Sequence, residues 1–195
     1  MKLISLAWIA LLFFTGAANA QDIYLALEAT GRGTYTIEGR FWTPGDPLLS
    51  WNVLTDYDHL PNFIPSLLTS HVQERTAKSL LLQQEAIGKA LLVFHRRLHV
   101  LLKVTEQPYQ QITFEDVSHQ DFRAYSGSWK IERADGGGSW VTYDLQATPN
   151  FFAPAPIART SFRKNARDLL LSIQSEIVRR GNLDRTLLCC SQIKN

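Results

Sequence analysis

Three side chains suited to acid–base or metal chemistry stand close together in the segment LTDYDHLPNFIPSL, residues 54–67. Asp56, Asp58 and His59 offer two carboxylates and an imidazole. A calcium-binding loop needs further oxygen ligands and a glycine at its sharp turn, and this segment contains no glycine. We therefore expect Asp56 and Asp58 to accept backbone N–H hydrogen bonds where one helix ends and another helical turn begins. A catalytic or metal-binding role for the three residues is the alternative.

A second pair of candidate ligands is His95 and His99, in the segment HRRLH. Two histidines at this spacing bind zinc from one face of a helix. The surrounding residues 91–105, however, include Val, Phe and Thr and alternate in the manner of a strand. On a strand the two side chains stand roughly 13 Å apart and do not share an ion. We expect them on the solvent side or at the rim, and the sequence predicts no metal and no cofactor.

The sequence carries no catalytic signature. It has no serine in a nucleophile elbow, no H-E-x-x-H or C-x-x-C motif and no phosphate-binding loop. Its two cysteines, Cys189 and Cys190, are adjacent and near the C-terminus. Neighbouring cysteines rarely form a disulfide with each other. Either these residues link two chains into a disulfide-bonded dimer in an oxidising compartment, or they belong to a tail without function.

The first twenty residues have the layout of a secretory signal peptide. Lys2 precedes an apolar run from Leu3 to Phe14, and Ala18-Asn19-Ala20 forms an A-x-A cleavage site. We expect the mature chain to begin at Gln21. The apolar run is shorter than the about 20 residues that span a bilayer, although an uncleaved anchor is the alternative. The sequence thus predicts an exported protein, periplasmic in a Gram-negative bacterium, with no membrane span after cleavage.

Composition predicts one globular domain. After the leader about 175 residues remain, enough for a single domain with a sizeable core. We assign residues 21–181 to this domain and residues 182–195 to a C-terminal tail. The formal net charge of +2 gives no electrostatic footprint for nucleic acid, so we expect no nucleic-acid partner.

Local patterns predict one strand, two short helical segments, a meander and a long helix. The first strand starts at Gly33, and Asp46 followed by Pro47 begins a helix that continues through Leu54. Pro61 and Pro65 limit a second helical turn. The meander strands lie near residues 69–74, 80–86, 91–105, 110–117, 122–132 and 140–148, with turns that include Gly88-Lys89 and Asp135–Gly138. The last helix begins at Pro156 and ends at Gly181.

Large apolar side chains share faces of these strands and of the last helix, and a few polar groups interrupt them. An apolar cleft with a few convergent polar groups is typical of a small-molecule site. The alternative is a filled core whose arginines extend to the rim. The candidate cavity residues are Tyr57, Phe63, Ile64, Phe94, Arg96, Leu98, Arg123, Tyr125, Trp129, Tyr143, Phe162 and Leu169.

Four segments resemble a known family. WNVLTDYDHLPNFIPSL is similar to the stretch that follows the first strand in the START-like (SRPBCC) superfamily, of the polyketide cyclase/dehydrase and coenzyme Q-binding type. GSWKI, VTYDLQATP and LLLSIQSEIVRRG resemble its last two strands and closing helix. The resemblance covers about Gly33 to Gly181. It implies an α+β helix-grip fold, in which a curved antiparallel sheet wraps around the long C-terminal helix and the two short helices form part of a lid.

The resemblance also implies a function. Members of this superfamily bind lipids, sterols, quinones or polyketides in the cavity, and some catalyse cyclisation or dehydration there. We expect an exported binding or carrier protein for a hydrophobic small molecule that is lipid-like, isoprenoid or polyketide-like. An enzyme of the cyclase, dehydrase or hydrolase kind is the alternative, with Arg96, Arg123, Tyr125 or Tyr143 as polarising or acid–base groups. A protein-interaction module, marked by an apolar patch on the outer face of the sheet, is a third possibility.

Overall fold

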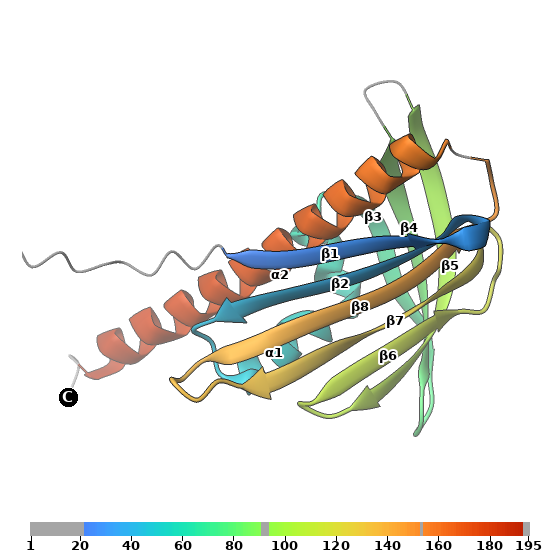
Figure 1. Ribbon diagram of the computed structural model, residues 1–195. Helices are drawn as coiled ribbons and strands as arrows, with labels where there is room; N and C mark the ends of the chain where they lie inside the picture. The colour runs from blue at the N-terminus through green and yellow to red at the C-terminus, as the bar shows by residue number, and fades with distance from the viewer. Residues whose placement is uncertain (1–21, 91–93, 153, 193–195) are drawn as a thin grey trace, which may run out of the picture.

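An eight-stranded antiparallel sheet curves around one long helix in the computed structural model, which describes residues 22–90, 94–152 and 154–192 (Figure 1). The strand order is β1-β2-β8-β7-β6-β5-β4-β3. This arrangement confirms the predicted helix-grip fold. The predicted signal peptide, residues 1–20, lies outside the described residues. The elements in chain order are β1 (Ile23–Thr30), η1 (Gly31–Gly33), β2 (Thr34–Thr43), α1 (Pro47–Leu54), η2 (Tyr57–Asn62), β3 (Leu67–Arg75), β4 (Leu80–Ala90), β5 (Phe94–Gln107), β6 (Gln111–Asp116), β7 (Phe122–Arg133), β8 (Ser139–Pro149) and α2 (Ala155–Gln192).

Strand β1 is the element that the sequence patterns above did not identify. It forms a hairpin with β2, from Ile23 opposite Phe41 to Thr30 opposite Thr34, and it is the edge of the sheet. Its sequence IYLALEAT places Ile23, Leu25 and Leu27 on one face, with Leu27 buried. This period of two is the signal that identifies such a strand.

Two predicted turns have different outcomes. The turn at Asp135–Gly138 is confirmed, because it joins β7 to β8 and both Gly137 (φ 89°) and Gly138 (φ 80°) have the left-handed conformation that glycine adopts readily. The turn at Gly88-Lys89 is wrong, since β4 continues to Ala90 and Gly88 pairs with Arg96 on β5. Glycine serves close packing there: a Cβ atom would lie 3.0 Å from Leu98 Cδ1.

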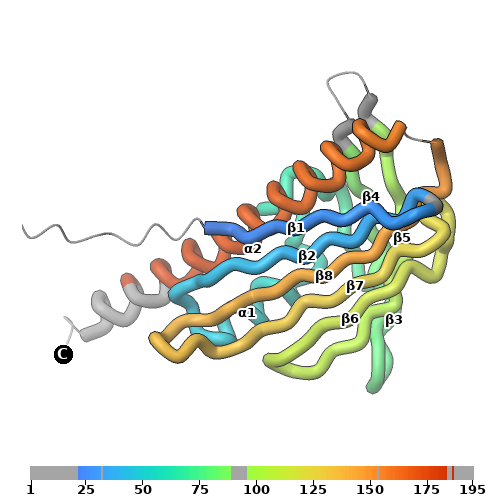
Figure 2. The backbone as a smooth tube through the Cα atoms, viewed as in Figure 1, coloured from blue at the N-terminus to red at the C-terminus, as the bar shows by residue number. Residues whose placement is uncertain are grey.

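Helix α2 lies against the concave side of the sheet (Figure 2), and its range Ala155–Gln192 is longer than predicted. Its end was expected at Gly181, yet the helix runs on to Gln192, so most of the predicted tail is helical. Gly181 serves the close packing of two helices instead, because a Cβ atom on it would lie 3.0 Å from Leu49 Cδ2 of α1. Glycine therefore brings α1 against α2 without ending the helix. The side chains of Cys189 and Cys190 lie outside those that the structure describes, and no described contact supports the disulfide-linked dimer.

The apolar face of α2 supplies much of the core. Ala166, Leu170, Ile173 and Ile177 are all buried against the sheet. Each large aliphatic side chain buried in this way contributes about 1.5–3 kcal/mol. Gly39 of β2 lies directly under Leu170, where a Cβ atom would overlap its side chain. The sheet thus lets the middle of the helix approach closely.

The α1–η2 region is attached at two points. As predicted, Asp46 caps α1: the Leu48 N–H donates to its Oδ1 at 2.9 Å, and Pro47 is the first helical residue. Asp58 also accepts a backbone bond, from the Val72 N–H of β3 at 3.0 Å. The predicted backbone role of Asp56 is wrong. Its carboxylate contacts side chains instead, with Arg180 Nη2 at 2.7 Å and His59 Nδ1 at 2.6 Å.

Arg180 makes this contact part of a network that ties η2 to α2. Its Nε donates to Glu176 Oε1 at 2.7 Å, and Arg179 donates to both oxygens of the same carboxylate. Burial raises the pKa of Asp56, but the hydrogen bonds from His59 and Arg180 outweigh it and lower the pKa below its ordinary value. The hydrogen bond from Arg179, followed by that from Arg180, lowers the pKa of Glu176 despite its partial burial.

Removing the Asp56 charge tests this network. We expect Asp56→Asn to lower the free energy of unfolding by about 1–2 kcal/mol at pH 7, because both partners are three-quarters buried and Arg180 loses one carboxylate. The pKa of Asp56 in the folded protein lies below its ordinary value of 3.8. The stabilisation by the Asp56 charge is therefore fully present above pH 3.8 and is lost as the pH falls through the lower, folded-state pKa. Urea unfolding between pH 7 and pH 3 measures both effects.

The matched control is Asp168→Asn, which removes a partner from the exposed ion pair with Lys164 on the same helix. Asp168→Asn should lower the free energy of unfolding by less than about 0.5 kcal/mol. Equal losses for the two variants, or a gap between wild type and Asp56→Asn that does not narrow below pH 4, would contradict a stabilising role for the network.

Candidate ligand-binding cavity

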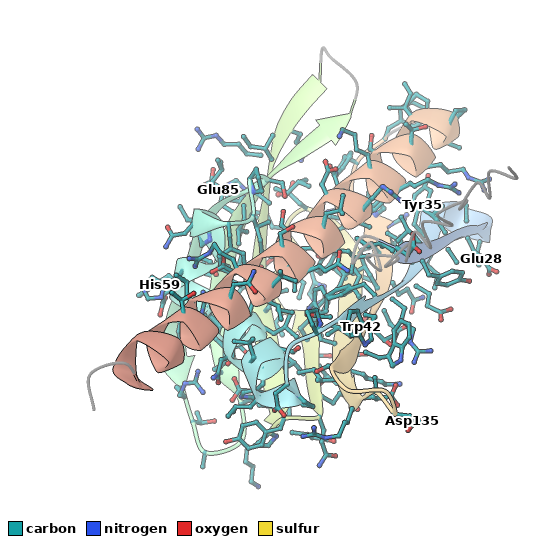
Figure 3. The ribbon with its side chains drawn as sticks, turned by 90° about the vertical axis from the view of Figure 1, so that its left-hand side faces the viewer. Glu28, Tyr35, Trp42, His59, Glu85 and Asp135 are labelled. Carbon is teal, nitrogen blue, oxygen red and sulfur yellow. The ribbon has the colours of Figure 1, made fainter. Side chains whose placement is uncertain are left out.

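A cavity of about 230 Å³ lies between the concave face of the sheet and α2. Figure 3 shows α2 crossing in front of this face, with Tyr35 of β2 on one side of the helix and Glu85 of β4 on the other. The volume is slightly below the roughly 300 Å³ at which small-molecule pockets usually begin, so it suits a compact ligand. Side chains from every strand except β1 and from α1, η2 and α2 reach the cavity or its edge.

Eight of the predicted candidates line this cavity. They come from η2 and its exit, from the central strands and from α2: Tyr57, Ile64, Leu98, Tyr125, Trp129, Tyr143, Phe162 and Leu169. The alternation of β5, β7 and β8 and the helical spacing of α2 identified six of them, whereas Tyr57 and Ile64 came from the lid that the family resemblance implies. Their contact with a ligand stays a prediction. The side chain of Phe94 lies outside the described residues.

Arg123 does not line the cavity, although the alternation of β7 placed it on the same face as Tyr125. The register with β8 shifts between Phe122 and Ala124, so an extra residue interrupts the alternation. This β-bulge turns Phe122 inward and leaves Arg123 exposed. A bulge of one residue has no clear signature in the sequence, which is why the prediction was wrong.

Arg96 lies at the rim. Its Nη2 donates to Asp121 Oδ1 at 2.6 Å, and its guanidinium lies 4.5 Å from the centre of the Phe151 ring. Burial raises the pKa of Asp121, but its hydrogen bonds from Arg96 and from the His99 N–H outweigh this and lower the pKa. Arg96 therefore closes the end of the sheet by pairing with a carboxylate, as the alternative of arginines at the rim predicted. His99 lies on β5, and its Nδ1 is 3.4 Å from Asp121 Oδ2.

Phe63 also lies outside the cavity. It packs on the opposite side of the η2 exit, beside Ser172, Glu176 and Arg179 of α2, with the Arg180 guanidinium 5.7 Å from its ring centre. Its neighbour Ile64 points into the cavity instead. The predicted lid edge thus divides its two large side chains between the cavity and the network of Arg180.

Two hydroxyl groups meet inside the cavity. Burial raises the pKa of both Tyr125 and Tyr143. The interaction between the two phenols lowers the pKa of Tyr125 and raises that of Tyr143, although burial is the largest cause for both. Both side chains line the cavity, so their hydroxyl groups are candidate hydrogen-bond partners for a ligand. Asp116 raises the pKa of Tyr125 further, although its own Oδ1 is taken by the N–H groups of Leu101 and Ser118.

Aromatic contacts fix these tyrosines in place. The Tyr143 ring lies 4.4 Å from Trp129, and the Tyr125 ring lies 4.8 Å from Phe122. Phe114 contacts both tyrosines. Tyr57 differs, because its hydroxyl donates to Glu106 Oε1 at 2.8 Å. Burial, reinforced by this bond, raises the pKa of Tyr57 far above its ordinary value.

The cavity is electrically neutral. Among the described side chains that line it, none belongs to Asp, Glu, Lys, Arg or His. The polar members that the sequence patterns missed are Ser66, Gln84 and Asn165. Isolated amides and hydroxyls are common at surfaces, so the sequence offered no signal for them. The described residues also contain no group of three His, Cys, Asp or Glu side chains placed to hold a metal ion.

Several partly exposed lining residues lie at one end of the cavity. They include Ile87 and Gly88 at the end of β4, Leu98 on β5, and Phe162 and Asn165 on α2. The residues from α1, η2 and the middle of β2 are buried. These residues give the cavity a partly exposed, accessible edge between β4 and the N-terminal half of α2.

Comparison with known proteins identifies the family. Residues 44–173 match the family model "Polyketide cyclase / dehydrase and lipid transport". The chain belongs to this family. The cavity of this polyketide cyclase/dehydrase and lipid transport member lies almost entirely within the matched residues. No curated protein sequence matches the chain at a significant level.

Solved structures share the fold of this family member. The Zhui aromatase/cyclase from Streptomyces sp. R1128 has a TM-score of 0.65 at 12% identity, covering 75% of this chain and 95% of that protein. The STAR-related lipid transfer protein from Xanthomonas axonopodis has a TM-score of 0.59 at 16% identity, covering 78% and 98%. Human STARD10 has a TM-score of 0.61 at 12% identity, covering 84% and 77%. At these identities the likeness shows the fold alone.

Filling the cavity tests whether it is a true space. Ala166 of α2 is buried and faces the cavity, whereas Ala147 of β8 is buried in the packed core and does not line it. We expect Ala166→Leu to change the free energy of unfolding by less than about 1 kcal/mol, while Ala147→Leu loses about 1–3 kcal/mol through overpacking. Urea unfolding measures the difference, and equal losses would mean that the core is filled.

Proposed function

We propose that this protein is an exported binding or carrier protein for a neutral hydrophobic small molecule of lipid-like, isoprenoid or polyketide-like chemistry. The observation that carries the proposal is the apolar, uncharged cavity between the sheet and α2, lined by described residues of the family fold. A charged ligand group would lose its hydration there without gaining an opposite charge. A neutral molecule gains from the apolar lining and loses little.

The ligand we propose carries a hydrogen-bond acceptor such as a carbonyl oxygen. The hydroxyl groups of Tyr125 and Tyr143 are the candidate donors, because both side chains line the cavity. A buried donor that finds no partner costs about 1–3 kcal/mol, so the pair favours a ligand with an oxygen at this place over a pure hydrocarbon. The solved aromatase/cyclase and lipid transfer structures of the same fold support a ligand of this general kind.

An enzyme of the cyclase or dehydrase kind is the second candidate, and the meeting of Tyr125 with Tyr143 in the cavity is the observation that favours it. Such chemistry needs a base that removes a proton and an acid that protonates the leaving oxygen. Both tyrosines have raised pKa values, so they are neutral donors that polarise a carbonyl but do not accept its protons at neutral pH. Arg96 and Arg123 lie outside the cavity lining. Binding without catalysis is therefore the function that the described residues support best.

A protein-interaction module fits less well. The outer face of the sheet has a shallow depression lined by threonine, serine, lysine and acidic side chains, including Thr36, Lys103 and Asp144. A stable interface needs an apolar centre, and the described residues of this depression do not form one.

Export is the second half of the proposal. The layout of residues 1–20 supports it, because it combines a basic start, an apolar run and a small-residue end. No helix among the described residues is both long and apolar enough to cross a bilayer. Export of a carrier would place its neutral ligand in a compartment between membranes.

Recovery of a ligand tests both halves together. We expect the full chain, produced in a Gram-negative host and purified from the periplasm, to have an intact mass that begins at Gln21. Native mass spectrometry should show an additional apolar molecule that organic solvent extracts, and Ala166→Leu should lose it. A repeatedly empty wild-type protein would contradict the carrier function, whereas a full-length chain retained in the cytoplasm would contradict export alone.

A matched pair of small molecules tests the role of the tyrosines. Fluorenone and fluorene have nearly the same shape, but only fluorenone carries a carbonyl. We expect the wild type to bind fluorenone more tightly and Tyr125→Phe to weaken that binding about 2- to 10-fold while leaving fluorene unchanged, because one hydrogen bond is lost. Isothermal titration calorimetry measures both dissociation constants. Tyr57→Phe is the control, since its hydroxyl already bonds to Glu106, and an equal effect of both variants on both molecules would contradict the assignment.

A further inference from the structure

An aromatic side chain projects into solvent at the open end of the molecule. Phe152 is 92% exposed and lies in the connection between β8 and α2. Most large apolar residues of the described chain are buried, and no other of the described exposed ones approaches this fraction. An exposed phenylalanine costs solubility, and such a residue commonly marks a surface that is covered in use.

Contacts link this residue to the mouth of the cavity. Its neighbour Phe151 lies under the Arg96 guanidinium, at 4.5 Å. Arg96 pairs in register with Gly88, which lines the accessible end of the cavity. The N-terminal end of α2 and the ends of β4 and β5 lie at this same end of the molecule (Figure 1). Phe152 thus lies at the same end of the molecule as the accessible edge of the cavity.

Positive charge surrounds the same end. Arg159, Arg163 and Arg167 occupy successive turns of α2 and are exposed. No carboxylate of the described residues forms an ion pair with them, whereas Lys164 is paired with Asp168. The first four turns of α2, which follow the exposed aromatic ring in the chain, therefore carry excess positive charge.

We propose that Phe152 and the arginines Arg159, Arg163 and Arg167 form a docking surface for an anionic phospholipid membrane. Phenylalanine enters the boundary between headgroups and acyl chains, and basic residues near that boundary are attracted to anionic lipids. A nucleic acid or an acidic protein would use the arginines but would not need an isolated, protruding phenylalanine beside the cavity mouth. Docking would bring the accessible edge of the cavity to a membrane that contains hydrophobic molecules. This role rests on the proposed carrier function.

Vesicle binding tests this surface with the mature protein, Gln21 to Asn195. We expect the protein to sediment with phosphatidylcholine vesicles in which about 30% of the lipid is anionic phosphatidylglycerol. It should bind vesicles of pure phosphatidylcholine at least about 10-fold more weakly. Replacing Arg163 and Arg167 by Gln should weaken the first binding about 10- to 30-fold, since each basic residue near an anionic surface contributes a similar increment. Phe152→Ser should weaken it about 10-fold, and this loss should persist in 0.5 M NaCl, roughly the salt at which screening is strong.

Two control variants remove similar groups from elsewhere. The double substitution Lys103→Gln and Lys130→Gln removes two exposed positive charges from β5 and β7. Tyr24→Ser removes an exposed aromatic ring from β1. Both should bind anionic vesicles as the wild type does. Equal losses in the control and test variants would overturn the proposal. It would also be overturned if the protein bound a DNA oligonucleotide as tightly as the vesicles and Phe152→Ser weakened neither.

Ala166→Leu separates this proposal from the carrier function. This variant should lose the cavity ligand yet bind anionic vesicles normally, because Ala166 faces the cavity. An empty wild-type protein that still binds vesicles through Phe152 would retain the docking surface and reject the carrier function. A wild-type protein that carries the cavity ligand but does not bind vesicles would retain the carrier function and reject the docking surface.

Discussion

Close approach of α2 to one end of the sheet is the constraint on which the rest of the structure depends. Three contacts with glycine permit it: Gly39 under Leu170, Gly45 beside Ile177 and Gly181 beside Leu49. A side chain at any of these positions would force the helix outward or displace its neighbour. Because the helix is held at this end, its position over the remainder of the sheet is determined as well.

The same constraint leaves a cavity along the helix–sheet contact, from Ile173 to Phe162 of α2. From Phe162 to Leu169 the helix faces long strands whose inward side chains are large and aromatic. These rings brace one another, as when Trp129 and Phe114 contact Tyr143, so the sheet does not collapse onto the helix. An aromatic wall resists rearrangement better than flexible aliphatic side chains do. The cavity is therefore a consequence of two unlike halves of one helix–sheet contact.

The Arg180 network strengthens the closed half. Arg180 joins η2 to α2 through Asp56 and Glu176, and Phe63 covers the guanidinium. The charges are satisfied among themselves, so the network adds orientation without placing a charge in the cavity. It also accounts for the acidic segment 54–67, whose carboxylates serve structure: Asp56 binds α2 and Asp58 binds β3.

Sequence reasoning succeeded where one residue's environment follows from regular geometry. The alternation of β8 placed Tyr143 inside, and Asp46 before Pro47 identified the start of α1. It failed where a distant partner decides the outcome. Nothing local distinguishes the Gly181 that packs against α1 from a glycine that ends a helix, and the bulge at Arg123 reverses the faces of its strand end through a shift in pairing with β8. Asp56 was wrong for the same reason, since its partner lies 124 positions away.

The two ends of the molecule therefore have different physical roles, and the ligand path follows from that difference. Opening the closed end would break an ion network and separate helices in close contact. At the other end, Gly88 lets Leu98 lie close to the backbone and Phe162 stacks on Tyr35 at 4.6 Å, while the Arg96–Asp121 ion pair lies outside the cavity lining. Rotation of a few apolar side chains costs less than disruption of paired charges. Entry beside Phe162 is thus the route of lowest resistance, and a hydrophobic ligand that uses it leaves water beside the exposed Phe152.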